Sequence, residues 1–319
     1  MNNYYDRIDK INNINILADL VCQEYNLGSL VKSHLVEVGY EDFNLKITTS
    51  KGKYLVKVFR NSRSDKEAEE CINRNYIAYK HRVKTPKVHK NSKGEILTII
   101  NYNGSRFRLS LIEYIDGKTF FDLKRKPTNK ELLRIVDLGS KINRIIYKPN
   151  FIYDSWAITS FCDEYEKKEK YIEQKYLNIL KPIYESFKIF DYSLLPFSFV
   201  HGDLRSTNLI LDDKGEIYAI DFSVSNYTAR LNEIIVICSE VAIIPNNKVE
   251  SEKRIKSAFM EWCNKVRATE FEKESFKLLF SVANAINVLN SAYELATGNN
   301  SEETKMYLES GLFALTLFK

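Results

Sequence analysis

The residues with the clearest chemical character lie in two short segments of the second half of the chain. Residues 201–208 read HGDLRSTN and residues 220–222 read IDF. Asp203 stands five residues before Asn208, and Asp221 stands thirteen residues after Asn208. Phosphoryl transfer uses an aspartate that accepts a hydroxyl proton, together with an asparagine and a second aspartate that bind magnesium, at comparable spacing. The pattern predicts Asp203 as the catalytic base and Asn208 and Asp221 as magnesium ligands.

Two neighbours of Asp203 have competing interpretations. Arg205 lies two residues after Asp203, where a guanidinium is suited to hold the transferred phosphate. A surface arginine is the alternative interpretation. His201 lies at the end of an apolar run, directly before Gly202. We predict that His201 is structural and hydrogen-bonds the backbone of the loop.

Phosphoryl transfer also requires a cation on the phosphates of the nucleotide. Residues 54–59 read YLVKVF, which predicts a strand. Because side chains alternate along a strand, Lys57 shares a face with Leu55 and Phe59. A lysine on an apolar face requires an anion, so Lys57 is predicted to bind nucleotide phosphate.

The usual partner of such a lysine is a glutamate on a nearby helix, and the pattern predicts a helix at 65–79. Glu67, Glu69 and Glu70 are the candidates, with a surface charge as the alternative interpretation of each. Glu69 shares a helical face with Ile72 and Tyr76, which predicts that it packs against the sheet. Glu70 lies one step around the helix, and the choice between the two stays open.

Two further segments are expected to contact the nucleotide because of their position. Residues 39–44 lie between two predicted strands and contain one glycine, Gly39, in place of a glycine-rich phosphate loop. A simple hairpin turn is the alternative interpretation. Residues 112–115 lie where a connecting strand offers backbone hydrogen bonds to adenine, which predicts contacts from Glu113 and Ile115.

The elements that position these residues change character along the chain. We expect an α+β, bilobal, protein-kinase-like fold. Residues 1–114 would form a nucleotide-binding lobe, with a preceding helix and a small antiparallel sheet into which one helix is inserted. Residues 115–319 would form a larger, mostly helical lobe with the catalytic loop and the acceptor site. The predicted strands are 35–40, 44–47, 54–59, 96–102 and 107–114, and the predicted helices are 8–25, 65–79, 129–146, 159–190, 229–243, 250–267, 270–296 and 302–317.

Composition argues against several other classes of protein. The 319 residues are 44% hydrophobic and 28% charged, with a net charge of +5 and no block of lysine or arginine, unlike a nucleic-acid-binding protein. The longest apolar run, 234–245, is interrupted by Ser239 and Glu240 and is too short to span a bilayer. The five cysteines are scattered, as in a reducing compartment. We expect a cytoplasmic protein without nucleic-acid or membrane partners; the sequence does not predict its oligomeric state.

Taken together, residues 35–235 resemble the aminoglycoside phosphotransferase/choline kinase family of small-molecule kinases. The resemblance is specific at HGDxxxxN and IDF, and looser at 39–44, Lys57 and 112–117. It implies ATP and Mg²⁺ as cofactors and transfer of the γ-phosphate to a hydroxyl of a small-molecule acceptor, with an aminoglycoside-type antibiotic favoured. Two positions depart from the family pattern. Glu233 stands where many members have an aspartate, and Ser223 replaces the glycine of D-F-G.

Other acceptors and other functions compete with this interpretation. Choline, ethanolamine, homoserine and sugars are alternative acceptors, because the predicted C-terminal helices contain both carboxylates suited to polycations and aromatic rings suited to quaternary ammonium groups. A protein kinase usually has an arginine where this chain has Gly202, and a longer segment after Asp221. A nucleotide-binding pseudokinase without turnover is the remaining alternative, although the catalytic set in this sequence is complete.

Overall fold

The computed structural model describes residues 4–11, 13–36 and 42–318. The chain forms two compact units. The N-terminal unit contains the residues up to Gly117 together with Asp212–Lys214 and Ile220–Ser223, and the C-terminal unit contains the other residues from Lys118 onward. Asp221 therefore belongs to the N-terminal unit, whereas Asp203 and Asn208 belong to the C-terminal unit.

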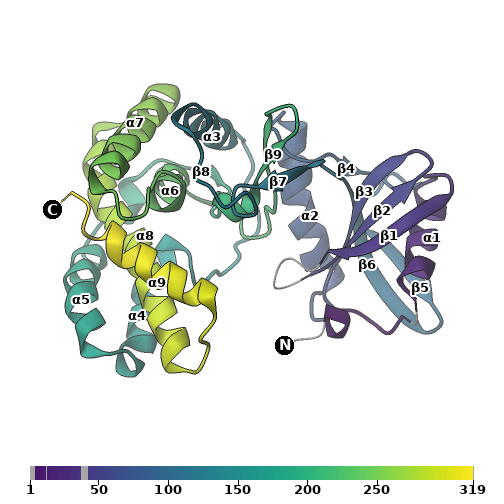
Figure 1. Cartoon of the computed structure of the whole chain (residues 1–319), viewed down its shortest axis with the longest axis horizontal. Helices are drawn as coiled ribbons and strands as arrows, with labels where there is room; N and C mark the ends of the chain where they lie inside the picture. Colours follow the sequence, from purple (N-terminus) through teal and green to yellow (C-terminus); the bar gives the residue numbers. More distant parts are fainter. Residues whose placement is uncertain (1–3, 12, 37–41, 319) are drawn as a thin grey trace. The chain divides into compact units, whose positions relative to one another are not determined.

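An antiparallel sheet forms the centre of the N-terminal unit (Figure 1). The strand order is β1-β2-β3-β6-β4, and β5 also pairs with β6. Between β5 and β6, Asn103 and Gly104 have φ angles of 47° and 80°, as a two-residue hairpin turn requires. The bounds of the strands are β1 Leu30–Val36, β2 Phe43–Thr49, β3 Gly52–Val58, β4 Val88–His89, β5 Thr98–Tyr102 and β6 Ser105–Glu113.

Two helices, α1 (Ile14–Glu24) and α2 (Asp65–Lys80), cover opposite faces of this sheet (Figure 1). Helix α1 packs on the face that contains Val56. Helix α2 packs on the other face, where its Ile72 belongs to the same buried cluster that Leu55 contacts. Each face of the sheet is therefore buried against one helix, and a side chain of β3 points toward α1 or α2 according to its parity.

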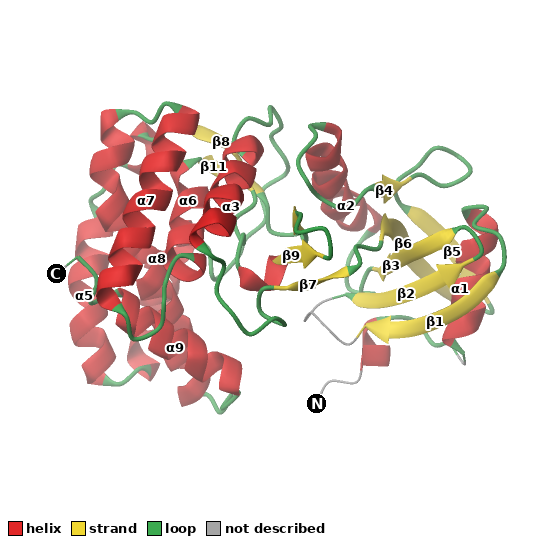
Figure 2. Ribbon diagram, turned by 45° about the horizontal axis from the view of Figure 1, so that its top comes forward, coloured by secondary structure: helices red, strands yellow, loops and turns green. Residues whose placement is uncertain are grey.

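Helices make up most of the C-terminal unit (Figure 2). The 27-residue α8 lies at its centre, with α4, α5, α6 and α9 packed against it. Helix α8 is buried around most of its circumference, as expected for a core helix. The bounds are α3 Asn129–Ile142, α4 Phe161–Lys168, α5 Gln174–Lys188, α6 Leu231–Val236, α7 Lys248–Val266, α8 Glu270–Ala296 and α9 Glu302–Ala314, and a π-helix, Ile237–Val241, continues α6.

Short strands flank the segments with chemical character. Strand β8 leads into residues 201–208 and pairs with β11. Strand β9 follows residues 201–208 and pairs with both β10 and β7, and Asp221 is the second residue after β10. The bounds are β7 Gly117–Thr119, β8 Phe197–Val200, β9 Leu209–Asp212, β10 Ile217–Ala219 and β11 Asn226–Ala229.

Some predicted elements differ in extent from the structure. The predicted helix 8–25 begins only at Ile14, as α1, where the Asn13 side chain caps it by accepting the Asn15 N–H. The predicted helix 159–190 is divided into α4 and α5, because the chain passes through a 3₁₀ turn, Glu169–Tyr171, and an extended Ile172 whose side chain is buried. The predicted strand 35–40 overlaps β1 at Leu35–Val36, and residues 37–40 lie outside the described residues. Strand β1 is an edge strand with exposed side chains, so it lacks the alternation that marks a strand in sequence. Across the described ranges, no helix combines the length and the apolar character needed to cross a membrane.

Candidate active site

Strand β3 carries Lys57 on the face of the sheet that α2 covers, the face of Leu55 and Phe59. The Lys57 ammonium lies 3.3 Å from a carboxylate oxygen of Asp42 and 3.4 Å from one of Asp221. Burial by itself lowers the pKa of Lys57, but the charges of Asp221 and Asp42 raise it by more. The ammonium is therefore protonated, and it meets two carboxylates on an otherwise apolar face.

Asp42 is a residue of this site that no sequence pattern predicted. It lies directly before β2, and its side chain is 4% exposed. Its carboxylate accepts the Arg60 N–H at 3.2 Å and forms an ion pair with Arg63 at 3.5 Å. Because β2 and β3 are antiparallel neighbours, the residue before β2 lies beside the end of β3 that carries Lys57. In sequence, an aspartate in such a loop looks like an ordinary turn residue.

The glutamates of α2 occupy other positions. Glu69 is exposed, because the buried face of the helix is formed by residues such as Ala68, Cys71 and Ile72. The expectation that Glu69 packs against the sheet is therefore wrong. Glu70 is partly buried and forms an ion pair at 3.7 Å with Arg74, one helical turn later. A helix glutamate as the partner of Lys57 stays a prediction.

Asp221 adopts a left-handed backbone conformation, with φ of 60°. Aspartate is one of the few residues other than glycine that adopt this conformation readily. Its Oδ1 accepts the Ser223 N–H at 3.4 Å, and 47% of its side chain is exposed. An accessible carboxylate of this kind fits a magnesium ion, which prefers oxygen ligands and keeps several water molecules.

The remaining predicted nucleotide contacts stay predictions. Gly39 lies outside the described residues. Glu113 ends β6, where its N–H donates to the Lys87 oxygen at 2.8 Å and its carboxylate accepts the Lys87 N–H at 3.1 Å. Both groups of Glu113 are therefore used inside the protein. Ile115 follows the end of β6 and is half-buried.

Residues 201–208 form a loop between β8 and β9, which we call the HGD loop. Gly202 has φ of 85°, a left-handed conformation that glycine adopts without strain. His201 is fully buried, and its Nδ1 accepts the Asp203 N–H at 3.2 Å. The His201 ring thus holds the backbone of the loop, and the predicted structural role is confirmed.

The carboxylate of Asp203 is held by Arg205 and Asn208. Asn208 Nδ2 donates to Asp203 Oδ2 at 2.7 Å and to the Asp203 backbone oxygen at 2.9 Å. Arg205 Nε lies 3.0 Å from Asp203 Oδ1. Because the amide nitrogen of Asn208 is committed to Asp203, its amide oxygen is the atom that fits a magnesium ion. The structure therefore brings the three predicted residues of this loop together.

Helices α8 and α9 fix the guanidinium of Arg205. Its Nη2 donates to Asn287 Oδ1 at 3.3 Å, and the guanidinium lies 5.6 Å from the centroid of the Tyr307 ring. The Trp156 ring packs against Tyr307, with centroids 5.9 Å apart. Burial raises the pKa of Tyr307 to about 12, so its phenol is neutral near pH 7. An asparagine and two aromatic rings therefore lie on the side of the HGD loop that carries Arg205.

Glu233 anchors the beginning of the HGD loop. This residue of α6 is fully buried, and its Oε2 accepts the His201 N–H at 2.7 Å. Gly139 of α3 provides the space, since a Cβ at that position would lie 3.1 Å from Glu233 Cγ. Burial raises the pKa of Glu233 to about 8, and the charge of Asp203 acts in the same direction. Glutamate is thus accommodated where the sequence departs from the family pattern.

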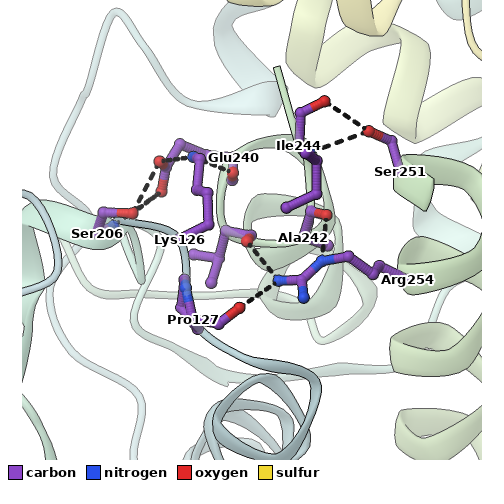
Figure 3. Close-up of polar contacts among 9 residues, drawn as sticks. Lys126, Pro127, Ser206, Glu240, Ala242, Ile244, Ser251 and Arg254 are labelled. Carbon is purple, nitrogen blue, oxygen red and sulfur yellow. Dashed lines mark hydrogen bonds and ion pairs between the residues drawn. The ribbon is translucent and has the colours of Figure 1, made fainter. Parts of the chain in front are cut away.

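Glu240 contacts the other end of the HGD loop (Figure 3). Its carboxylate accepts the Ser206 N–H at 2.8 Å and the Ser206 hydroxyl at 2.8 Å, and it forms an ion pair of 2.6 Å with Lys126. A signal was present in the sequence, because a carboxylate inside an apolar run requires a partner. The partners themselves lie 34 and 114 residues away, a separation that no local pattern predicts.

The two units offer complementary chemistry. In the N-terminal unit, the buried ammonium of Lys57 and the accessible carboxylate of Asp221 are suited to phosphate and to a metal ion. In the C-terminal unit, Asp203 has a fixed carboxylate that can accept the proton of a hydroxyl group. These are the requirements of phosphoryl transfer to an alcohol.

Comparison with protein families agrees with this chemistry. The model of the phosphotransferase enzyme family matches residues 34–252, which include the HGD loop, Lys57 and Asp221. No curated protein sequence matches the chain.

Several solved kinase structures share the fold. Spectinomycin phosphotransferase, in complex with ADP and spectinomycin, has a TM-score of 0.64 at 12% identity, over 96% of this chain and 94% of that one. Amicoumacin kinase, in complex with AMP-PNP and Ca²⁺, has a TM-score of 0.64 at 16% identity, over 97% and 94% of the two chains. Choline kinase from Streptococcus pneumoniae has a TM-score of 0.59 at 13% identity, over 95% and 98%. The family match spans most of the chain, and the protein is therefore a small-molecule kinase that belongs to the phosphotransferase enzyme family.

Proposed function

We propose that this enzyme transfers the γ-phosphate of ATP, in the presence of magnesium, to a hydroxyl group of an aminoglycoside-type antibiotic. The observation that carries the proposal is the HGD loop, in which Arg205 and Asn208 hold the Asp203 carboxylate at 3.0 and 2.7 Å. Spectinomycin appears in the name of a kinase of similar fold, which supports this class of acceptor.

We assign nucleotide binding to the N-terminal unit. Lys57 neutralises phosphate oxygens with an ammonium whose position Asp42 fixes at 3.3 Å. The ADP and AMP-PNP bound to two kinases of similar fold support a nucleotide donor. When bound, magnesium would neutralise charge on the phosphates, and the Asp221 carboxylate and the Asn208 amide oxygen stay its predicted ligands.

We assign the acceptor and its deprotonation to the C-terminal unit. The acceptor hydroxyl donates a hydrogen bond to Asp203, which takes the proton as the hydroxyl oxygen bonds to the γ-phosphorus and the bond from this phosphorus to ADP breaks. Arg205 and Asn208 keep the carboxylate in one orientation, which spares the reaction the entropy of arranging it. The guanidinium of Arg205 also favours the negative charge of the transferred phosphate.

The surroundings of Arg205 support an acceptor with amino groups. The rings of Tyr307 and Trp156 lie 5.9 Å apart on this side of the loop, and aromatic faces attract ammonium groups. The same rings, and the fold shared with a choline kinase, favour choline or ethanolamine as the second candidate. Homoserine and sugars complete the set of acceptors to be tested.

The test is ADP release from Mg-ATP in the presence of aminoglycosides, choline, ethanolamine, homoserine, amino sugars and a generic protein substrate. We expect release that depends on one class of small molecule. Asp203→Asn should lower kcat by roughly 10²- to 10⁴-fold, the range for loss of a general base, while calorimetry shows that Mg-ATP still binds. The matched control is Asp191→Asn, an exposed aspartate of the same unit, which should leave both measurements unchanged.

Each other outcome identifies the step of the reasoning that is wrong. Turnover that survives Asp203→Asn would exclude Asp203 as the base. Failure of the wild type to bind Mg-ATP would exclude the roles of Lys57 and Asp221. Release stimulated by the protein substrate alone would replace the small-molecule acceptor with a protein.

A further inference from the structure

The HGD loop is held from outside by two glutamates of one continuous helical segment. Glu233 in α6 accepts the His201 N–H at 2.7 Å, and Glu240 in the π-helix accepts the Ser206 N–H at 2.8 Å. The two glutamates are seven residues apart in the chain, and both side chains contact the HGD loop. Asp203 lies between the two backbone groups that they hold.

Inside the loop, the contacts transmit the position of Ser206 to the reactive side chains. Ser206 begins a 3₁₀ turn that ends at Asn208, and the Asn208 N–H donates to the Arg205 oxygen at 2.9 Å. The Asn208 side chain then bonds to Asp203 at 2.7 Å. A displacement of Ser206 therefore shifts Asn208 and, through its amide, the Asp203 carboxylate.

Glu240 is itself held by contacts with Lys126 (Figure 3). Lys126 Nζ binds the Glu240 carboxylate at 2.6 Å and its backbone oxygen at 2.7 Å. The Ala242 N–H donates to the Ile237 oxygen, the five-residue hydrogen bond of a π-helix. Arg254 donates to the oxygens of Ala242 and Pro127 at 2.9 and 2.8 Å, and so ties the end of the π-helix to the segment that carries Lys126.

The electrostatics are those of a carboxylate kept in its charged form. Burial by itself raises the pKa of Glu240, but the charge of Lys126 and the hydrogen bonds from Lys126 and Ser206 lower it by more. Its two oxygens accept from three donors: the Ser206 N–H, the Ser206 hydroxyl and Lys126. A glutamine at this position has one carbonyl oxygen, and its NH₂ group would face a donor, so it cannot satisfy all three.

We propose that Glu240, held by Lys126, is a positioning residue for phosphoryl transfer, which fixes the Ser206 end of the HGD loop and thereby the orientation of Asp203 and Asn208. This inference rests on the proposed function for its catalytic part. Glu240 in the π-helix and Glu233 in α6 thus hold the two ends of the loop from one continuous segment.

The test compares Glu240→Gln with a closely matched control, Glu131→Gln. The Glu131 side chain is 16% exposed, pairs with Arg125 at 2.7 Å and accepts the Thr128 N–H at 2.7 Å. The Glu240 side chain is 17% exposed and has the equivalent set of contacts. Both substitutions remove a carboxylate that forms an ion pair and accepts a backbone N–H. The partners of Glu131, however, lie outside the HGD loop.

We expect Glu240→Gln to lower kcat by roughly 10- to 100-fold, as small misplacements of catalytic groups do, with KM for ATP within about threefold of the wild type. Hydrogen exchange of the segment 201–208, measured without substrate, should become faster. Glu131→Gln should leave kcat and this exchange unchanged. If Glu240→Gln does not fold, Ser206→Ala removes the hydroxyl contact alone, and it should give the same directions with smaller changes.

Three outcomes would overturn the inference. A folded Glu240→Gln whose segment 201–208 exchanges as slowly as in the wild type would refute the anchor. Faster exchange with unchanged kcat would refute the positioning role. A wild type that phosphorylates no acceptor would remove the proposed function and the catalytic part of this inference, whereas faster exchange in Glu240→Gln would still establish the anchor.

Discussion

Replacing Glu233 with glutamine should change the way in which the stability of this protein depends on pH. Glu233 is fully buried, and its Oε2 accepts the His201 N–H. Among the described residues, its Oε1 has no hydrogen-bond partner. Glutamine is a close mimic of the protonated side chain, because its oxygen can accept the same N–H and it carries no charge.

The size of this change in stability follows from the pKa values of Glu233 in the unfolded and folded states. Burial raises the pKa of Glu233 from 4.5 to about 8, so between these pH values the folded protein holds a proton that the unfolded chain has released. The free energy of unfolding therefore falls as pH rises through this window, by about 1.4 kcal/mol per pH unit. Between pH 5.5 and 8.5, the free energy of unfolding of the wild type should fall by about 3 kcal/mol relative to that of Glu233→Gln.

The assay is denaturant unfolding of both proteins at pH 5.5, 7 and 8.5, monitored by circular dichroism. Other titrating groups are common to the two proteins, so the difference between them isolates Glu233. The free energy of unfolding of Glu233→Gln, relative to that of the wild type, should rise with pH and level off above pH 8. A difference that is constant across this range would refute the reasoning, because it would mean that Glu233 has a similar pKa in the folded and unfolded states.

Two further predictions concern the N-terminal unit and the packing of the C-terminal helices. Asp42→Asn should raise KM for ATP by roughly tenfold, because it removes a fixed carboxylate 3.3 Å from Lys57. Glu69→Gln, a substitution at an exposed position, should leave steady-state kinetics unaltered. Equal effects of the two substitutions would contradict the assignment of Asp42 to the nucleotide site. Gly311→Ala should lower stability by about 1–3 kcal/mol, because a Cβ there would lie 2.9 Å from a Val288 methyl of α8. Thermal melting against Glu309→Ala, an exposed change on the same helix, measures this effect, and an unchanged melting temperature would show that α9 can move away.

Local spacing in the sequence was enough to predict several residues and elements of this protein. The HGDxxxxN segment predicted that Asp203 and Asn208 lie together on one short loop, and their side chains are hydrogen-bonded at 2.7 Å. Strand alternation placed Lys57 on the face that α2 covers. Two helices, Asp65–Lys80 and Glu270–Ala296, were predicted within one residue at each end.

Tertiary structure decided which groups hold these residues in place. Asp42 is bonded to Lys57 across two strands, and Glu240 to Lys126 across 114 residues. The helical pattern predicted Glu69 on the face that packs against the sheet, but its side chain is exposed to solvent, because the packing of the whole sheet determines the buried face of α2. Periodicity reports which side of an element is buried, but not which distant residue meets it. Which charged partner a buried group has is decided by the tertiary contacts, because a charge removed from water must be paired wherever the fold places it.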